Sequence, residues 1–412
     1  MKRLKNRLLK NKKISAAAKY LASVVALVLA AVIIGLLGGV IGASFSKAIE
    51  AVTEVREKNS FVVFLLPFGG LISVLLYKIT KTERIGTDRI LESARGEGKT
   101  PFLIMPVVFA ASVITHLFGG SAGKEGAALQ IGGAIAQPFS RLVHADEKTG
   151  SLFTVCGMSA LFSAVFGIPI GACVFAAEVA AVGMLNGLSL MPSFVSSITA
   201  YFVSVSLGVA PERFELHSVP ELSAVSLLKT AAAAAVIAVV SAVFCFMLHG
   251  GEKLFEKIIK NPYIRIFAGG CIIVVLTLIF GTDYNGGGMS VIEQIFDRGI
   301  INTEAFLLKI IFTVVTVASG YKGGEIVPSF FIGGALGAVV SPCIGLPSQF
   351  GAAVGMVSFF SGVTNCPLAA AVISAELFGV QGLVLFAAAA FISRVASGNI
   401  SLYHKQKIKE SL

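Results

Sequence analysis

Apolar residues are gathered into long continuous runs along the chain, with short polar breaks between them. The clearest runs are Tyr20–Ala43, Phe61–Tyr77, Pro101–Leu117 and Ala231–Leu248. About 20 apolar residues in a helix cross roughly 30 Å of hydrocarbon, so these runs are long enough to span most or all of a bilayer. Shorter runs such as Ile266–Phe280 are expected to be tilted, broken or buried among neighbours. The pattern predicts an all-α integral membrane protein.

Composition agrees with this reading. The 412 residues are 55% hydrophobic and only 14% charged, and their mean hydropathy is +0.86. A soluble domain carries roughly a quarter charged residues. A chain with so few charges lacks the polar surface that a water-soluble fold needs.

The net charge of +10 is concentrated at the two ends of the chain. The basic residues of the N-terminal tail, 1–14, and of the C-terminal tail, 404–412, are Lys2, Arg3, Lys5, Arg7, Lys10, Lys12, Lys13, His404, Lys405, Lys407 and Lys409. By the positive-inside rule both ends are cytoplasmic, which requires an even number of crossings. The basic residues flank membrane segments, which disfavours nucleic acid as a partner. The first apolar run is too long for a signal peptide and is expected to be retained.

The six cysteines are scattered, and the chain has neither a C-x-x-C pair nor a Cys/His ligand spacing. We therefore expect no disulfide, no metal and no cofactor.

The chain contains an internal repeat. Gly119–Ala136, GGSAGKEGAALQIGGAIA, is similar to Ser319–Gly337, SGYKGGEIVPSFFIGGALG. Gly120, Gly123 and Glu125 match Gly320, Gly323 and Glu325 at an offset of 200, and Ile131–Ala134 matches Ile332–Ala335 at 201. Segments that begin at Gly157 and Gly355 match in the same order at an offset of 198. Two ordered matches at nearly one offset indicate a duplication.

The duplication divides the chain into two membrane repeats, 15–210 and 223–403, joined by a polar linker over 211–222. Many transporters consist of two such halves, with the binding site near the bilayer midplane between them. Similarity alone does not distinguish an inverted from a parallel repeat.

Each repeat contains a glycine-rich break that is suited to binding an anion. Gly123, Lys124, Glu125 and Gly126 interrupt one apolar stretch, and the segment 323–328 interrupts the other. Glycines break a helix and let backbone amides face a ligand, while the helix that follows directs its positive N-terminal end at the break. Two such ends from opposite halves would form an anion site without a full positive charge.

Glu125 is the leading candidate for a gating residue. An ionisable group at membrane depth is costly and usually lies on an ion or proton path. A carboxylate beside an anion site can occupy that site and leave it when protonated. The alternative is that Glu125 pairs with Lys124 or caps a helix at the interface.

Three further glutamates and one histidine are weaker candidates. Glu325 is a second candidate carboxylate because of its repeat position. For Glu178 and Glu376, which follow prolines late in apolar helices, bonding to loop amides is at least as plausible as transport. His116 is expected to be packed or interfacial.

Sequence patterns that suggest an enzyme fail on inspection. The segment GGSAGK lacks the spacing of a phosphate-binding loop, and Ser121 in GGSAG lacks the strand-to-helix turn of a hydrolase nucleophile. No HExxH sequence occurs. We therefore expect that the protein is not an enzyme.

The motifs resemble those of the CLC family of chloride channels and anion/proton antiporters, over about residues 20–408. GKEGA looks like the family's gating motif, so the resemblance implies that Glu125 is the gating glutamate. GGEIVP stands in place of the motif whose amides face the central anion, at Ile326 and Val327, and Tyr403 fits the pore-lining tyrosine at the start of the last helix. The resemblance implies an inverted repeat with broken helices meeting at a midplane anion site. It also implies a homodimer and a multi-pass location in the plasma (inner) membrane with both termini inside.

The departures from the family pattern resemble its divergent bacterial branch, which exports fluoride against protons. The first anion motif is missing, and its counterpart is Arg84-Ile85-Gly86-Thr87-Asp88, of which Ile85, Gly86 and Thr87 are candidates for an anion contact. Val179 stands where chloride/proton exchangers carry an internal glutamate, and Glu325 lies inside the second motif. GTDYNGGG, 281–288, also resembles that branch. Val327 stands where the branch has a threonine.

Four hypotheses follow from these observations. The leading one is a fluoride/proton antiporter, and its alternative is a chloride channel or chloride/proton antiporter of the same fold. An unrelated transporter of organic anions would need a larger basic pocket, whereas Lys124 and Lys322 are the only lysines expected near the broken helices. A membrane enzyme or receptor has no supporting constellation of residues.

Overall fold

The computed structural model describes residues 2–83, 85–180, 182, 187–299 and 302–407, without the side chains of residues 2–20 and 188. The side chains of the basic N-terminal tail, together with Arg84 and Lys409, therefore lie outside the description. Within the described ranges the secondary structure is helical, with sixteen α-helices, one 3-10 helix and no extended strand. The predicted all-α membrane fold is confirmed.

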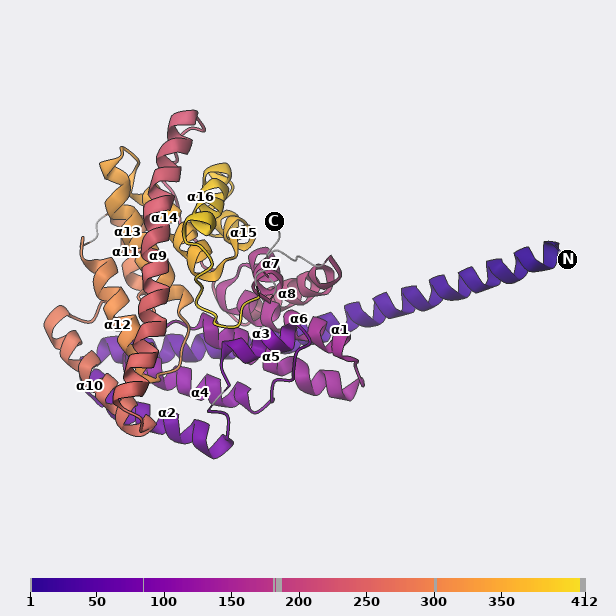
Figure 1. Cartoon of the computed structure of the whole chain (residues 1–412), viewed down its shortest axis with the longest axis horizontal. Helices are drawn as coiled ribbons and strands as arrows, with labels where there is room; N and C mark the ends of the chain where they lie inside the picture. Colours follow the sequence, from indigo (N-terminus) through magenta and orange to yellow (C-terminus); the bar gives the residue numbers. More distant parts are fainter. Residues whose placement is uncertain (1, 84, 181, 183–186, 300–301, 408–412) are drawn as a thin grey trace.

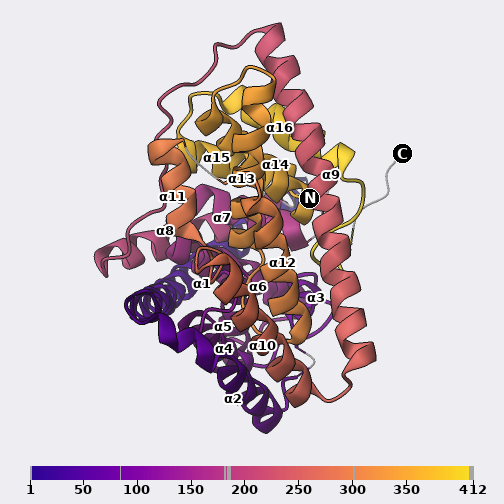
Figure 2. The same ribbon diagram turned by 90° about the vertical axis from the view of Figure 1, so that its left-hand side faces the viewer.

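Two consecutive sets of eight α-helices form the molecule (Figures 1 and 2). The first set comprises α1 (Lys2–Lys58), η1 (Ser60–Leu65), α2 (Leu66–Thr80), α3 (Thr87–Ala94), α4 (Ile104–Leu117), α5 (Glu125–Leu142), α6 (Glu147–Phe166), α7 (Pro169–Ala180) and α8 (Gly187–Ser206). The second comprises α9 (Ala224–Ile258), α10 (Pro262–Phe280), α11 (Met289–Arg298), α12 (Ala305–Ser319), α13 (Ile326–Cys343), α14 (Ser348–Thr364), α15 (Pro367–Phe378) and α16 (Leu383–Ala396). Residues 209–223 join the sets without a helix.

The same pairs of helices pack together in both sets. The α5–α6 contact corresponds to α13–α14, α1–α8 to α9–α16, α2–α4 to α10–α12, and α3–α5 to α11–α13. Small residues allow the closest of these contacts, since a side chain on Gly132 or Gly333 would collide with the backbone of α6 or α14. The internal repeat in the sequence is therefore a repeat of packing as well.

Reciprocal bonds between the halves give the repeat an approximate two-fold axis. The Glu178 carboxylate of α7 accepts hydrogen bonds from the backbone N–H groups of Leu368 (3.2 Å) and Ala369 (2.7 Å) in the first turn of α15. The Glu376 carboxylate of α15 accepts from Ile170 (3.0 Å) and Gly171 (2.6 Å) in the first turn of α7. Each carboxylate thus pairs with first-turn N–H groups in the opposite half, which have no partner within their own helix. Its negative charge also complements the positive N-terminal end of that helix. The sequence offered bonding to loop amides as the alternative to transport, and the partners are instead amides in the first turns of helices.

Seven helical segments are long and apolar enough to cross a membrane, among the described residues. Shorter apolar helices include α4, α7, α12, α15 and α16. In Figure 1 the N-terminal end of α1 extends away from the other helices, and in Figure 2 α9 runs along one side of the molecule. The core between the halves is rich in phenylalanine, with Phe162, Phe175 and Phe360 packed in series at centroid distances of 5.0 and 5.2 Å.

Candidate anion pathway between two cavities

A short antiparallel bridge joins the two broken helices. Gly123 N–H donates to Gly324 O and Gly324 N–H donates to Gly123 O, both at 2.6 Å. A Cβ atom on Gly126 would lie 2.9 Å from the Cα atom of Gly324, so the backbones approach more closely than any side chain allows. The bridge brings the N-terminal ends of α5 and α13 together.

The bridge also corrects the register of the repeat. Gly123 is paired with Gly324, and the residues that precede the two helices are Lys124 and Glu325. The offset at this point is therefore 201, whereas the sequence comparison aligned Glu125 with Glu325 at 200. The same offset already holds before the bridge, where Gly120 N–H donates to Thr115 O as Tyr321 N–H donates to Thr316 O. Glu325 is the counterpart of Lys124, and Ile326 is the counterpart of Glu125.

Glu125 reaches across the bridge to the opposite helix. Its Oε2 atom accepts a hydrogen bond from Val327 N–H at 3.2 Å, in the first turn of α13. The side chain folds over Gly123, where the lack of a Cβ leaves room for the carboxylate. The residue is fully buried, and its Oε1 atom has no hydrogen-bond partner among the described residues. The carboxylate occupies a place that is electrostatically suited to an anion.

Lys124 does not pair with Glu125. Its ammonium nitrogen lies 3.5 Å from Glu212 Oε1 and donates to Ser46 Oγ at 3.2 Å. The lysine thus joins α1 and the inter-repeat segment instead of neutralising the buried carboxylate. The first alternative for Glu125, an ion pair with its neighbour, is wrong.

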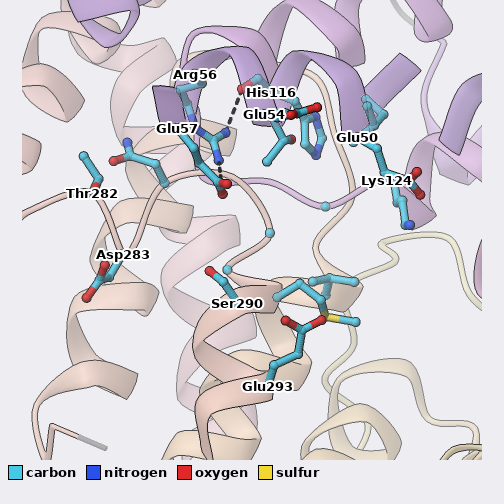
Figure 3. Close-up of a pocket in the computed structure, with 18 of the residues that line it drawn as sticks. Glu50, Glu54, Arg56, Glu57, His116, Lys124, Thr282, Asp283, Ser290 and Glu293 are labelled. Atoms are coloured by element: carbon cyan, nitrogen blue, oxygen red, sulfur yellow. Dashed lines mark hydrogen bonds and ion pairs between the residues drawn. The ribbon is translucent and has the colours of Figure 1, made fainter. Parts of the chain in front are cut away.

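Glu125 borders a cavity of about 550 Å³, here called the Glu125 cavity. Its wall includes Gly123, Lys124 and Val327 together with the C-terminal end of α1 and the segment 282–290 (Figure 3). Carboxylates dominate its charge: Glu50, Glu54, Glu57, Glu212, Asp283 and Glu293. Such a lining disfavours a large organic anion as the ligand of this cavity.

Two buried cations, Lys309 and Arg56, lie close to the wall segment 284–288. The ammonium of Lys309, on α12, donates to Tyr284 O (3.0 Å) and Gly286 O (2.7 Å) and lies 5.2 Å from the centroid of the Phe331 ring. Arg56 donates to His116 O at 2.7 Å, a bond that Figure 3 marks. Lys309 thus braces the segment against α12, whereas Arg56 joins the end of α1 to α4.

Neither cation was recognised from the sequence, which placed only Lys124 and Lys322 near the breaks. The one available signal was a lone lysine in the apolar run of α12. His116 itself is packed, with Nδ1 2.8 Å from Ser112 O.

A second cavity of about 740 Å³, the Glu325 cavity, lies on the other side of the bridge. It shares no lining residue with the first. The predicted residues that line it are Ile85, Gly86, Thr87, Glu325 and Tyr403. Thr87 accepts a hydrogen bond from Gln130 of α5 at 3.1 Å. The structure thus divides the predicted site residues between two cavities, with Gly126 and Ile326 at the bridge between them.

Tyr403 belongs to an irregular segment, because residues 399–407 contain no helix. The prediction that it begins a last helix is therefore wrong. Leu402 N–H donates to Val363 O at 2.8 Å, and Lys405 reaches back to the first half, where its Nζ lies 2.6 Å from Glu92 Oε1. These contacts hold Tyr403 at the Glu325 cavity.

A duplicated membrane bundle in which two broken helices separate two cavities defines a multi-pass membrane transport protein. Comparisons with known proteins specify the class further. The family model described as voltage gated chloride channel matches residues 68–398. A chloride/fluoride channel protein of Pseudomonas syringae pv. tomato is 32% identical over 378 residues, which cover 90% of this chain and 83% of the relative.

Solved structures give the same result. A CLC-type fluoride/proton antiporter has a TM-score of 0.91 and 31% identity, over 94% of this chain and 98% of its own. A slow cyanobacterial Cl⁻/H⁺ antiporter, at a TM-score of 0.77 and 18% identity over 90% and 94% of the chains, shares the fold. The chain belongs to the CLC, or voltage gated chloride channel, family and is a CLC-type anion transporter. Members of this family are channels and transporters.

Proposed function

We propose that this protein is a fluoride/proton antiporter that exports fluoride, with Glu125 as its gate and proton carrier. The observation that carries the proposal is the position of the Glu125 carboxylate at the N-terminus of α13. There it accepts a hydrogen bond from Val327 N–H and is fully buried at the edge of a cavity. Two similar proteins, one a chloride/fluoride channel and one a fluoride/proton antiporter, support fluoride as the anion.

The mechanism follows from competition for one helix end. An ionised Glu125 holds the amides of α13 and excludes a free anion from them. Protonation removes the charge that this helix end attracts, so the side chain leaves and an anion takes its place. The proton and the anion then move in opposite directions through the same point.

The remaining candidate residues act on the two sides of this gate. Gly123 and Gly126 permit the close approach, and the backbone of Lys124, Ile326 and Val327 supplies N–H groups to the anion. On the other side, Glu325 and Tyr403 face the anion in the Glu325 cavity, with 85–87 as the segment that replaces the family's first motif. Glu325 serves there as a second carboxylate.

The orientation we propose has both termini in the cytoplasm and the protein in the inner membrane. Two copies form a homodimer, and each chain consists of the repeats 15–210 and 223–403. The Glu325 cavity then faces the cytoplasm, because Tyr403, His404 and Lys405 line it. The Glu125 cavity faces outward, beside the C-terminal end of α1. Its carboxylates attract protons and repel anions, which favours anion exit there.

A chloride channel or chloride/proton antiporter is the second candidate. The observation that favours it is Val327, whose apolar side chain stands at the anion-facing turn of α13 where fluoride transporters of this branch have a threonine. A side chain without a hydroxyl gives a small, strongly hydrated anion no additional donor.

Anion efflux from proteoliposomes tests the two candidates. Vesicles loaded with fluoride or chloride are read with ion-selective electrodes, and external pH is recorded at the same time. We expect fluoride efflux with proton uptake, much faster than chloride efflux. Fast chloride efflux would establish the second candidate instead.

A further inference from the structure

A third cavity, of about 920 Å³, lies at the junction of α2 and α10 with the segment before α13. We call it the basic side pocket. Four cationic side chains line it, accompanied by two tyrosines: Lys78, Lys260, Arg265, Lys322, Tyr77 and Tyr263. Glu83 and Glu256 are its acidic residues, so its lining carries an excess of positive charge.

The cations of the pocket are incompletely compensated. Lys78 lies 5.3 Å from the Tyr263 ring centroid and Lys322 lies 5.1 Å from that of Tyr77, but no carboxylate is within 4.0 Å of either ammonium among the described residues. Arg265 forms an ion pair with Glu256 at 3.3 Å through Nη1 only. Its Nε atom is buried without a hydrogen-bond partner in the same residues. A buried unpaired donor costs free energy and indicates an acceptor that is not part of the chain.

The surface beside the pocket is apolar. Exposed aliphatic side chains flank its charged residues on both helices: Ile72, Leu75 and Ile79 on α2, and Ile264 on α10. In a membrane these side chains contact acyl chains, whereas the lysines and tyrosines are residues typical of the headgroup region. The pocket therefore combines a place for an anionic group with a place for the hydrocarbon attached to it.

We propose that the basic side pocket binds the phosphate headgroup of an anionic phospholipid. Phosphate oxygens accept hydrogen bonds from the Arg265 Nε–H and the lysine ammonium groups, and the acyl chains lie against α2 and α10. In the orientation proposed above, on which this step rests, the lipid belongs to the inner leaflet. The headgroup would sit beside the anion pathway, because Glu83, Glu256, Arg265, Gly320 and Lys322 line both this pocket and the Glu325 cavity.

Native mass spectrometry of the purified full-length protein tests this site. The protein is incubated with phosphatidylglycerol or with phosphatidylcholine, and the retained lipid is counted. We expect preferential retention of phosphatidylglycerol, reduced about tenfold in Lys78→Gln/Arg265→Gln. The matched control is Lys257→Gln. This exposed lysine lies at the C-terminal end of α9, next to the pocket residue Glu256, but does not line the pocket. The control should retain as much lipid as the wild type.

A second variant and a competitor complete the test. Lys78→Gln/Lys260→Gln changes two exposed side chains, so its folding should be unaffected, and it should also lose phosphatidylglycerol. Undiminished retention in both double variants, or equal loss in Lys257→Gln, would overturn the proposal. Displacement of the lipid by millimolar inorganic phosphate would show that the pocket binds free phosphate and would also overturn it. Because no transport is measured, failure here is distinct from failure of the antiporter proposal.

Discussion

The N-terminus of α5 and the N-terminus of α13 share one backbone arrangement but present different side chains. Each follows a glycine of the bridge and points toward the other half. The carboxylate of Glu125 is bonded to the first turn of α13. At the first turn of α5, Glu325 Oε2 lies 3.5 Å from where a Cβ atom of Gly126 would stand, and Lys124, which precedes the helix, forms no capping hydrogen bond through its side chain.

The comparison shows how a duplicated backbone can serve a directional process. Two equivalent helix ends provide two places for negative charge near the midplane. Different residues at corresponding positions then bring the Glu125 carboxylate to the first turn of α13 and place Glu325 in a separate cavity. Four experiments test how the two halves differ and what holds them together, from the largest expected effect to the smallest.

Replacing Glu125 by glutamine should abolish proton coupling, because the amide cannot carry the proton. Anion-driven proton uptake in proteoliposomes should fall to the background of empty vesicles. Glu50→Gln is the control, since Glu50 lines the same cavity but does not reach the helix end. If Glu325→Gln removed coupling while Glu125→Gln kept it, the assignment of the two ends would be reversed.

Replacing Lys309 by methionine should destabilise the fold through the wall of the Glu125 cavity. The change leaves the carbonyl groups of Tyr284 and Gly286 without their donor in a buried site, at about 1–3 kcal/mol for each unsatisfied group. We expect a lower midpoint of thermal unfolding in detergent. Lys229→Met is the matched control, because this half-buried lysine also donates to a carbonyl, that of Gly345, but at an exposed site. Equal midpoints in both variants would contradict the bracing role.

Replacing Glu178 or Glu376 by glutamine should have equal effects, because their bonds are reciprocal. Each change removes charge-assisted hydrogen bonds to two helix N–H groups, which are worth about 2 kcal/mol in free energy of unfolding. Denaturant titration of the two variants measures this directly. A large difference in stability between the two variants would mean that the halves differ in the α7–α15 contact as well as at the helix ends of the bridge.

Replacing Glu92 by glutamine should weaken the attachment of the C-terminal segment by less than about 1 kcal/mol, as is usual for accessible ion pairs. The hydrogen bonds from Lys405 and Arg89 lower the pKa of Glu92 from 4.5 to about 2. Because the pKa is lower in the folded protein, the ionised carboxylate stabilises the fold at pH values above its ordinary pKa. This contribution is lost as the pH falls toward 2. The difference in unfolding midpoint between variant and wild type should therefore persist from pH 8 to pH 5 and shrink below it. A difference that grew on acidification would exclude this ion pair as its cause.

Local signals account for what the sequence revealed about the site. Glycine breaks in apolar runs and a carboxylate beside one of them identified Gly123, Glu125 and the N-terminus of α13, because each signal depends on a few adjacent residues. The fold class followed from hydropathy and duplication in the same way. The resemblance added the residues 85–87 and Tyr403, which the structure places at one cavity.

Contacts between distant segments account for what the sequence did not reveal. The register of the second break depended on an offset of 200 or 201, and a shift of one position makes Glu325 the counterpart of Lys124 instead of Glu125. Lys309 is paired with carbonyl groups more than 20 residues away, so no local pattern announces it. The irregular course of 399–407 follows from its bonds to α3 and α14, which a helical pattern cannot predict.

The reciprocal bonds of Glu178 and Glu376 have a consequence for how the chain is made. Glu376 follows Glu178 by 198 residues. At about 5–20 residues per second, a ribosome needs roughly 10–40 s to synthesise that interval. During this time the first turn of α7 has emerged without its carboxylate partner, and Glu178 waits for amides not yet made. Completion of the second half therefore ends a period in which the nascent first half depends on lipid, water or the insertion machinery for these partners.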